Sequence, residues 1–208
     1  MPTATIQKPK KKKTSVRRSK AVTQYTYADY LRLPADERYE IINGKLRKMS
    51  PSPSFTHQEI SGDLFFLLKM ALSHSKPDKC KIVSAPIDVI LTDKGEELDK
   101  AKNIVQPDIV VVCDKSKITN QGIIGAPDFI IEIVSPSSVK FDTIEKFKLY
   151  ERYGVKEYWI VFPSEKVLQA FLHNGSNFEL KDVYTQQEKA RSYILGVEFD
   201  MSKVFPSQ

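Results

Sequence analysis

The sequence has few cysteines and no long apolar run, and each of these absences excludes a class of protein. Its two cysteines, Cys80 and Cys113, are too few for a disulfide framework and lack the spacing of a structural zinc site. No stretch approaches the roughly 18 uninterrupted apolar residues of a membrane span, and no apolar signal segment follows the N-terminal charges. We therefore expect a cytoplasmic protein in a reducing compartment, with no membrane partner.

Acidic residues are absent from positions 1–20, and this absence locates the positive charge of the chain. That segment holds 8 of the 32 basic residues, so residues 21–208 carry 24 basic and 26 acidic side chains. We expect a disordered basic tail over 1–20 and one domain over 21–208, whose apolar content is enough for one core. The tail either binds phosphates without sequence preference or is a solvated extension.

The order of the expected elements is that of an α/β protein. A β-hairpin is predicted from 39–42 and 45–49, because Asn43 and Gly44 between them tolerate the positive φ of a type I′ turn. Helices are predicted over 56–73 and 142–153, with Asp142 as the N-cap of the second and Gly154 just beyond its end. Strands rich in β-branched residues are predicted over 82–91, 105–113, 129–134, 157–162, 166–172 and 178–184.

The predicted helix over 142–153 connects the strands 129–134 and 157–162. A strand, a helix and a second strand in this order favour a parallel pair at the centre of a mixed sheet flanked by helices. The last strand, 178–184, would then lie at an edge.

Two carboxylates lie at positions where the packing of a fold alone would not require an acidic residue. Glu132 interrupts the apolar run 129–134, which is typical of a strand buried on both faces, and a buried carboxylate needs a cation or several donors. Asp108 follows Pro107 and opens the apolar run 109–112, so it lies at the end of a strand. Two such carboxylates can hold Mg²⁺ with water in its remaining positions, and a bound water can then attack a phosphodiester.

A lysine is available on the predicted helix over 142–153. At 100° per residue, Lys146 projects on the apolar face beside Tyr150 and Tyr153, with Asp142 one turn earlier. Lys146 would therefore point inward, where it could orient a water, stabilise phosphate charge or pair with Asp142.

Each of these residues also has a structural interpretation. Glu132 could be the ion-pair partner of Lys146, and Asp108 could be a turn residue. His57 lies on the apolar stripe of the helix over 56–73, where a satisfied core histidine is more common than a catalytic base. Glu40, in the predicted hairpin, could be exposed or could join the site.

At these positions the sequence resembles the bacterial Uma-two (Uma2) family of restriction endonucleases, within the PD-(D/E)XK nuclease superfamily. The similar segments are, in chain order, 39–46, 49–51, His57, 106–108, 132–138, Asp142, Lys146, Tyr150 and 154–161. Several ordered motifs agree over about 25–162, although each motif alone is weakly specific.

The resemblance implies a restriction-endonuclease-like core and names its site residues. Asp108 would be the motif aspartate, Glu132 the second metal ligand, and the backbone carbonyl of Ile133 a further ligand. The superfamily lysine lies two residues after the acid, where this chain has Val134, so Lys146 would supply it from the following helix.

A second departure concerns the predicted turn. Asn43 stands where many relatives have Asp, which leaves open any role of that position.

These observations favour a Mg²⁺- or Mn²⁺-dependent endonuclease that hydrolyses DNA, with Asp108, Glu132, Lys146 and Glu40 in its site. Cleavage of both strands with one site per chain would favour a homodimer. The alternatives are a catalytically inactive DNA-binding or adaptor protein of the same fold, and a hydrolase of RNA. No helix-turn-helix or zinc finger is evident, so the sequence predicts no recognition site in DNA.

Overall fold

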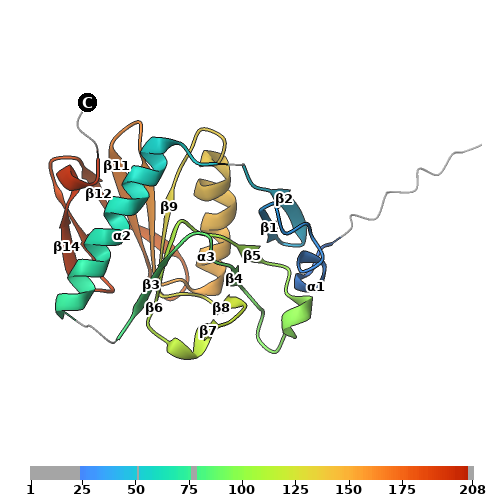
Figure 1. The fold of residues 1–208 in the computed structure, drawn as a ribbon. Helices are drawn as coiled ribbons and strands as arrows, with labels where there is room; N and C mark the ends of the chain where they lie inside the picture. The colour runs from blue at the N-terminus through green and yellow to red at the C-terminus, as the bar shows by residue number, and fades with distance from the viewer. Residues whose placement is uncertain (1–23, 51, 76–78, 206–208) are drawn as a thin grey trace, which may run out of the picture.

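Two six-stranded sheets and a two-stranded hairpin organise the residues described by this computed structural model, which are 24–50, 52–75 and 79–205 (Figure 1). The predicted basic tail over 1–20 lies outside the described residues. Among those that are described, no helix has the length and apolar character needed to cross a bilayer.

The central sheet has the strand order β12-β11-β10-β9-β6-β3. Its strands are β3 (Lys81–Ser84), β6 (Ile109–Val112), β9 (Phe129–Ile133), β10 (Glu157–Phe162), β11 (Val167–His173) and β12 (Phe178–Thr185). β9 and β10 pair in parallel and are joined through a helix, and every other pair in this sheet is antiparallel. The predicted parallel pair, its central place and the edge position of β12 are therefore confirmed.

Helices cover both faces of the central sheet (Figure 1). The long helix α2 (Phe55–Ser75) packs through its apolar stripe against residues such as Ile109 and Ile131. The helix α3 (Phe147–Tyr153) packs against the alternate residues, such as Val110 and Ile130, on the other face. Because side chains alternate along a strand, one apolar run supplies both interfaces.

The outer sheet has the strand order β2-β1-β5-β4-β8-β7 and contains the predicted hairpin. Its strands are β1 (Tyr39–Ile42), β2 (Lys45–Lys48), β4 (Val89–Ile90), β5 (Ile104–Val105), β7 (Ile118–Thr119) and β8 (Gly122–Ile124). Asn43 (φ 50°) and Gly44 (φ 73°) form the turn with positive φ that the sequence predicts. Residues of this sheet share a core cluster with α3, which therefore packs between the two sheets.

The prediction of single continuous strands over 82–91 and 105–113 is wrong. The first is divided between β3 and β4 at the cis peptide Ala85-Pro86, and the second between β5 and β6 at the segment 106–108. Proline has no N–H to donate to a ladder, so each proline-containing segment ends a strand in one sheet and leads into the other.

The helix after β9 begins earlier than predicted, and Asp142 is not its N-cap. Backbone bonds from Ser138 and Val139 to the Ser135 carbonyl open the helix. It then passes through a π-helical turn, η3 (Phe141–Lys146), before continuing as α3. The predicted end is confirmed, because Gly154 closes α3 in the left-handed conformation (φ 73°).

The C-terminal hairpin of β13 (Lys189–Ser192) and β14 (Val197–Asp200) was not predicted from the sequence. The buried carboxylate of Glu157 accepts hydrogen bonds from the side chain of Ser192 and the backbone N–H groups of Tyr193 and Ile194. Glu157 thus fixes the hairpin against β10. Short helices complete the chain: α1 (Tyr27–Tyr30), η1 (Leu98–Lys100), η2 (Lys115–Lys117) and η4 (Met201–Lys203).

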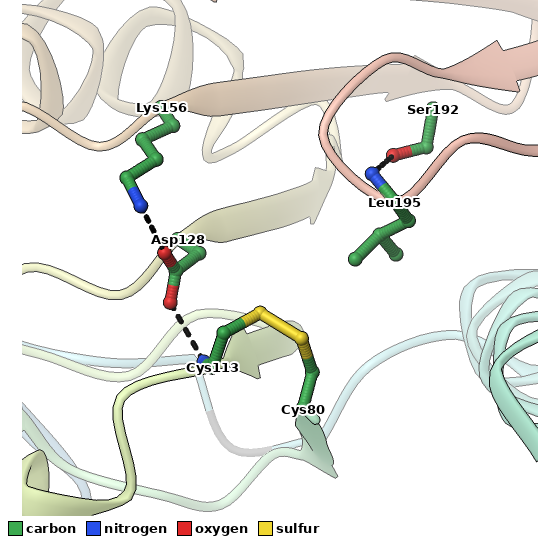
Figure 2. Close-up of a disulfide and its surroundings, with 6 residues drawn as sticks. All are labelled: Cys80, Cys113, Asp128, Lys156, Ser192 and Leu195. Carbon is green, nitrogen blue, oxygen red and sulfur yellow. Dashed lines mark hydrogen bonds and ion pairs between the residues drawn. A yellow bond between two sulfur atoms is a disulfide. The ribbon is translucent and has the colours of Figure 1, made fainter. Parts of the chain in front are cut away.

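Cys80 and Cys113 form a disulfide across the end of the β3–β6 ladder (Figure 2). The N–H of Cys113 donates to Asp128, whose other carboxylate oxygen accepts from Lys156. The expectation that two cysteines mean a reducing compartment is therefore not supported. Cysteine number carried no information about pairing, whereas the antiparallel register of Lys81 with Val112 places the two cysteines opposite each other.

Candidate active site

A cleft of about 530 Å³ collects the polar residues that the sequence singled out. Its walls come from both sheets, the start of α2, the segment 106–108 between β5 and β6, and the π-helical turn. The residues with ionisable side chains that line it are Arg38, Glu40, Arg47, His57, Asp108, Glu132, Asp142 and Lys146.

Lys146 lies at the centre of this cleft and is 3% exposed. Its Nζ lies 2.8 Å from Oε1 of Glu40, 2.9 Å from Oε1 of Glu132 and 3.7 Å from Oδ1 of Asp142. Burial alone would lower the pKa of Lys146, but Glu132, Glu40 and Asp142 together raise that pKa well above its ordinary value. The three carboxylates therefore favour the charged ammonium form of Lys146.

Glu132 extends from β9 toward α3, on the same face of the strand as Ile130. Its Oε1 accepts from Lys146 and, at 2.8 Å, from the hydroxyl of Tyr150. Burial raises the pKa of Glu132 well above its ordinary value, and the charges of Asp142, Asp108 and Glu40 add to that rise. The lysine therefore does not compensate fully for the negative charge around Glu132.

Asp108 lies just before β6 and is fixed through one of its oxygens. Its Oδ2 accepts the backbone N–H of Ile133 at 2.8 Å and lies 3.2 Å from Nε2 of His57. Burial lowers the pKa of His57, but the hydrogen bond and charge of Asp108 outweigh burial and raise it above its ordinary value. Among the described residues both contacts of the Asp108 carboxylate end on Oδ2, so Oδ1 could accept a ligand in the cleft.

Glu40 joins the site from the outer sheet and is 2% exposed. Its Oε1 accepts the backbone N–H of Gln106 at 3.0 Å in addition to the bond from Lys146. The side chain of Gln106 accepts in turn from Nε of Arg38. The hairpin therefore places Glu40 in the cleft rather than in solvent, which resolves the alternative that the sequence left open.

Oxygen donors near Asp108 and Glu132 suit a hard divalent cation. Three buried carboxylates share one lysine here, and burial raises the pKa of Asp142 as well as that of Glu132, so a further positive charge would be stabilised. Within the described residues, no three His, Cys, Asp or Glu side chains form a ready metal cage. Asp108 and Glu132 would supply the one or two carboxylates by which Mg²⁺ is commonly held, with water in its remaining positions.

The structure brings together all the site residues that the sequence predicted. Asp108, Glu132, Lys146 and Glu40 line one cleft, and Ile133 lines it beside them. Sequence reasoning missed other residues of the cleft, namely Arg38, Arg47 and Gln106. The alternation of the β2 hairpin strand could have indicated Arg47, whereas nothing in the sequence placed Arg38 or Gln106 next to Glu40.

Comparisons with known proteins agree with this architecture. The sequence profile of a family described as "Uma2: Putative restriction endonuclease" matches residues 27–202. A crystal structure from Anabaena variabilis, described as "a putative nuclease", superposes with a TM-score of 0.67 at 18% identity, over 87% of this chain and 97% of that one. An uncharacterized protein of Synechocystis sp. is 22% identical over 81% of this chain and 84% of its own length.

Proposed function

The chain belongs to the Uma2 restriction endonuclease family, and on this premise we propose that it is a metal-dependent endonuclease that hydrolyses DNA. The observation that carries the proposal is the convergence of Glu40, Glu132 and Asp142 on Lys146, with Asp108 in the same cleft. Concentrated carboxylates with one buried lysine provide both a cation site and a fixed positive charge.

The carboxylates of Asp108 and Glu132 and the carbonyl of Ile133 would hold Mg²⁺ or Mn²⁺. A bound cation lowers the pKa of a coordinated water and offsets charge on the phosphate that is attacked. The hydrogen bonds from Tyr150 to Glu132 and from the Ile133 N–H to Asp108 hold the two carboxylates in place before substrate arrives.

Lys146 would act on the phosphate and on the attacking water. Its ammonium group is fixed by Glu40 and Glu132, so it requires little reorganisation to donate to a non-bridging phosphate oxygen. Attack by water forms a new phosphorus–oxygen bond and breaks the bond to the leaving nucleoside oxygen. The proton of the water passes to solvent or to a cleft carboxylate.

A cleavage assay tests the proposal. Purified protein is incubated with duplex DNA, single-stranded DNA and RNA, in Mg²⁺, in Mn²⁺ and in EDTA. We expect metal-dependent cleavage of DNA that Asp108→Ala and Lys146→Ala each abolish and that the exposed matched variant Glu198→Ala retains. Equal cleavage by wild type and Asp108→Ala would refute the proposal, and preferential cleavage of RNA would change the substrate.

Two further expectations stay proposals. We propose that two copies act together on a duplex, because each chain offers one cleft, and sedimentation with and without DNA measures this. We also propose cytoplasmic action, where cellular DNA is accessible, although the disulfide removes the cysteine-based reason for it.

A further inference from the structure

A second, shallower pocket of about 320 Å³ lies beside the cleft. The hairpin strand β2 contributes Lys45 and Arg47, and the beginning of the helix contributes Lys140 and Glu145. Arg47, Ser137 and Phe141 line both pockets, so the two are continuous along this wall. We call this second space the flanking pocket.

The wall between the two pockets is a stacked pair of side chains. The guanidinium carbon of Arg47 lies 3.7 Å from the ring centroid of Phe141, and Nζ of Lys146 lies 5.7 Å from the same centroid. Stacking on an aromatic ring holds a guanidinium in one orientation while leaving its N–H groups at the ring edge free to donate. Arg47 therefore has a defined position between the buried lysine of the cleft and the flanking pocket.

The charge of the flanking pocket differs from that of its surroundings. It holds three cations, Lys45, Arg47 and Lys140, against one acid, Glu145, whereas residues 21–208 as a whole carry a small negative net charge. Within 24–50, 52–75 and 79–205, neither Lys45 nor Lys140 forms an ion pair with a carboxylate. These two charges are therefore not used to hold the fold together.

A polyanion that enters the cleft meets an excess of carboxylates there, so it needs cations on either side of the reacting phosphate. We propose that the flanking pocket binds a phosphate of the nucleic-acid backbone next to the one cleaved, through Lys45, Lys140 and Arg47. The proposal rests on the proposed function, because it takes the occupant of the cleft to be a nucleic acid. Recognition of this kind reads the backbone and not the bases.

Salt-dependent binding measures the neutralised phosphates directly. A labelled DNA duplex is titrated with the full chain in EDTA, which prevents metal-dependent cleavage, at several salt concentrations. The magnitude of the slope of log K against log salt falls by about 0.9 for each phosphate that the protein no longer neutralises, so Lys45→Ala with Lys140→Ala, which removes the contact with the one flanking phosphate, should reduce it by about 0.9. The matched control Lys181→Ala removes an exposed charge on the edge strand β12 of the central sheet, which lines neither pocket, and should leave the slope unchanged.

A substitution that removes a negative charge instead of a positive one distinguishes an electrostatic effect on binding from a loss of folded structure. Glu145→Gln removes the one acid of the flanking pocket and should strengthen binding, whereas the lysine variants weaken it. A loss of structure would weaken binding in every variant. Arg47→Lys keeps the charge but loses the planar group that stacks on Phe141, and should weaken binding less than Arg47→Ala.

The outcomes distinguish this proposal from the proposed function. An unchanged salt slope in the double lysine variant overturns the flanking pocket, even if Asp108→Ala abolishes cleavage. If Asp108→Ala cleaves like wild type while the double variant has a reduced slope, the backbone site stands and the nuclease mechanism fails. A wild-type protein that binds neither DNA nor RNA overturns both.

Discussion

At the scale of single residues, Lys146 connects carboxylates from three different elements. Its Nζ contacts Glu40 on β1, Glu132 on β9 and Asp142 in the π-helical turn, and all four side chains are nearly inaccessible to water. The carboxylates depend on this ammonium group, because without it they would be buried with no cationic partner, although Tyr150 and the N–H of Gln106 still donate to Glu132 and Glu40.

Removing the ammonium group should therefore destabilise the fold strongly. We expect Lys146→Met to lower the free energy of unfolding by about 3–5 kcal/mol at neutral pH, because it leaves buried carboxylates unpaired. The loss should shrink at acidic pH, where those carboxylates bind protons. Urea denaturation at both pH values measures this, with the exposed Lys181→Met as the control. Equal losses at the two pH values would contradict the electrostatic explanation.

The pH dependence of stability expected from Glu132 is opposite to that expected from Lys146. A carboxyl whose pKa is raised by folding stabilises the native state below its ordinary value of 4.5 and loses that contribution as pH rises through the folded value. Wild-type stability should therefore fall more steeply with rising pH than that of Glu132→Gln, which cannot ionise. Thermal unfolding at a series of pH values above 4.5 measures the two slopes, and parallel curves would be inconsistent with a raised pKa.

The same pair of proteins tests cation binding without any activity. Mg²⁺ that binds only the folded protein should raise the melting temperature of wild type in a concentration-dependent way. Glu132→Gln should respond weakly or not at all, because one of the two ligand carboxylates is gone. Glu198 is exposed and distant in sequence from the residues that line the cleft. Glu198→Gln should therefore respond to Mg²⁺ like wild type.

The free-energy cost of burying a charged side chain predicted part of this site from the sequence, but it could not predict the rest. An acid inside an apolar strand required a cation, and helical periodicity identified Lys146 as the inward-facing candidate. Glu40 stayed undecided, because its position depends on how the hairpin packs against the rest of the chain. The hydrogen bond from the Gln106 N–H that fixes Glu40 joins residues 66 positions apart, which no local pattern contains.

At the scale of elements, the helix that follows β9 determines where Lys146 and Asp142 lie. Its first part is π-helical and its end is closed by Gly154 at a φ of 73°, a conformation that only glycine adopts without cost. π-helical turns are rare and occur often at functional sites. Here the turn contains Asp142 and Lys146, the two ionisable residues that the helix contributes to the cleft.

Two glycine substitutions should change stability in opposite directions. Gly154→Ala forces a side chain into the left-handed region and should cost about 1 kcal/mol, although its Cβ would meet no neighbour. Gly62→Ala, in the exposed middle of α2 where a Cβ also meets nothing, should add about 0.5–1 kcal/mol through helix propensity. Chemical denaturation measures both, and changes of the same sign would disprove the backbone explanation.

Sequence periodicity predicted an element correctly where all of its residues pack in the same part of the fold. The hairpin at Asn43 and Gly44, α2 and the parallel pair β9–β10 follow from local signals that tertiary packing does not override. The strands around Pro86 and Pro107 could not be predicted, because their apolar runs continue through residues that leave one sheet for the other. The π-helical turn has no sequence signature that distinguishes it from an α-helix.

At the scale of the whole molecule, the disulfide links strands at the edge of the central sheet. Cys80 and Cys113 are separated by 33 positions, so the bond restricts a long loop of the unfolded chain. The segment between them contains β4, β5 and Asp108, which connect the central sheet to the outer sheet and to the cleft.

Loss of the disulfide should therefore lower global stability. Cys80→Ser with Cys113→Ser should reduce the free energy of unfolding by about 2–4 kcal/mol, and a reducing agent should have the same effect on wild type. Urea denaturation with and without dithiothreitol measures this. The double variant is its own control, since it should not respond to the reductant, and an unresponsive wild type would show that the bond contributes nothing.

The ion pair between Lys146 and Glu40 has a consequence for the life of the protein in a cell. Glu40 belongs to the outer sheet and Glu132 to the central sheet, and one ammonium group holds both. A chain still emerging from the ribosome, or one whose sheets have separated, does not possess the complete cleft. Any hydrolytic activity would therefore require both sheets to be folded and in contact, so copies that are still folding, or whose sheets have separated, should not cleave DNA.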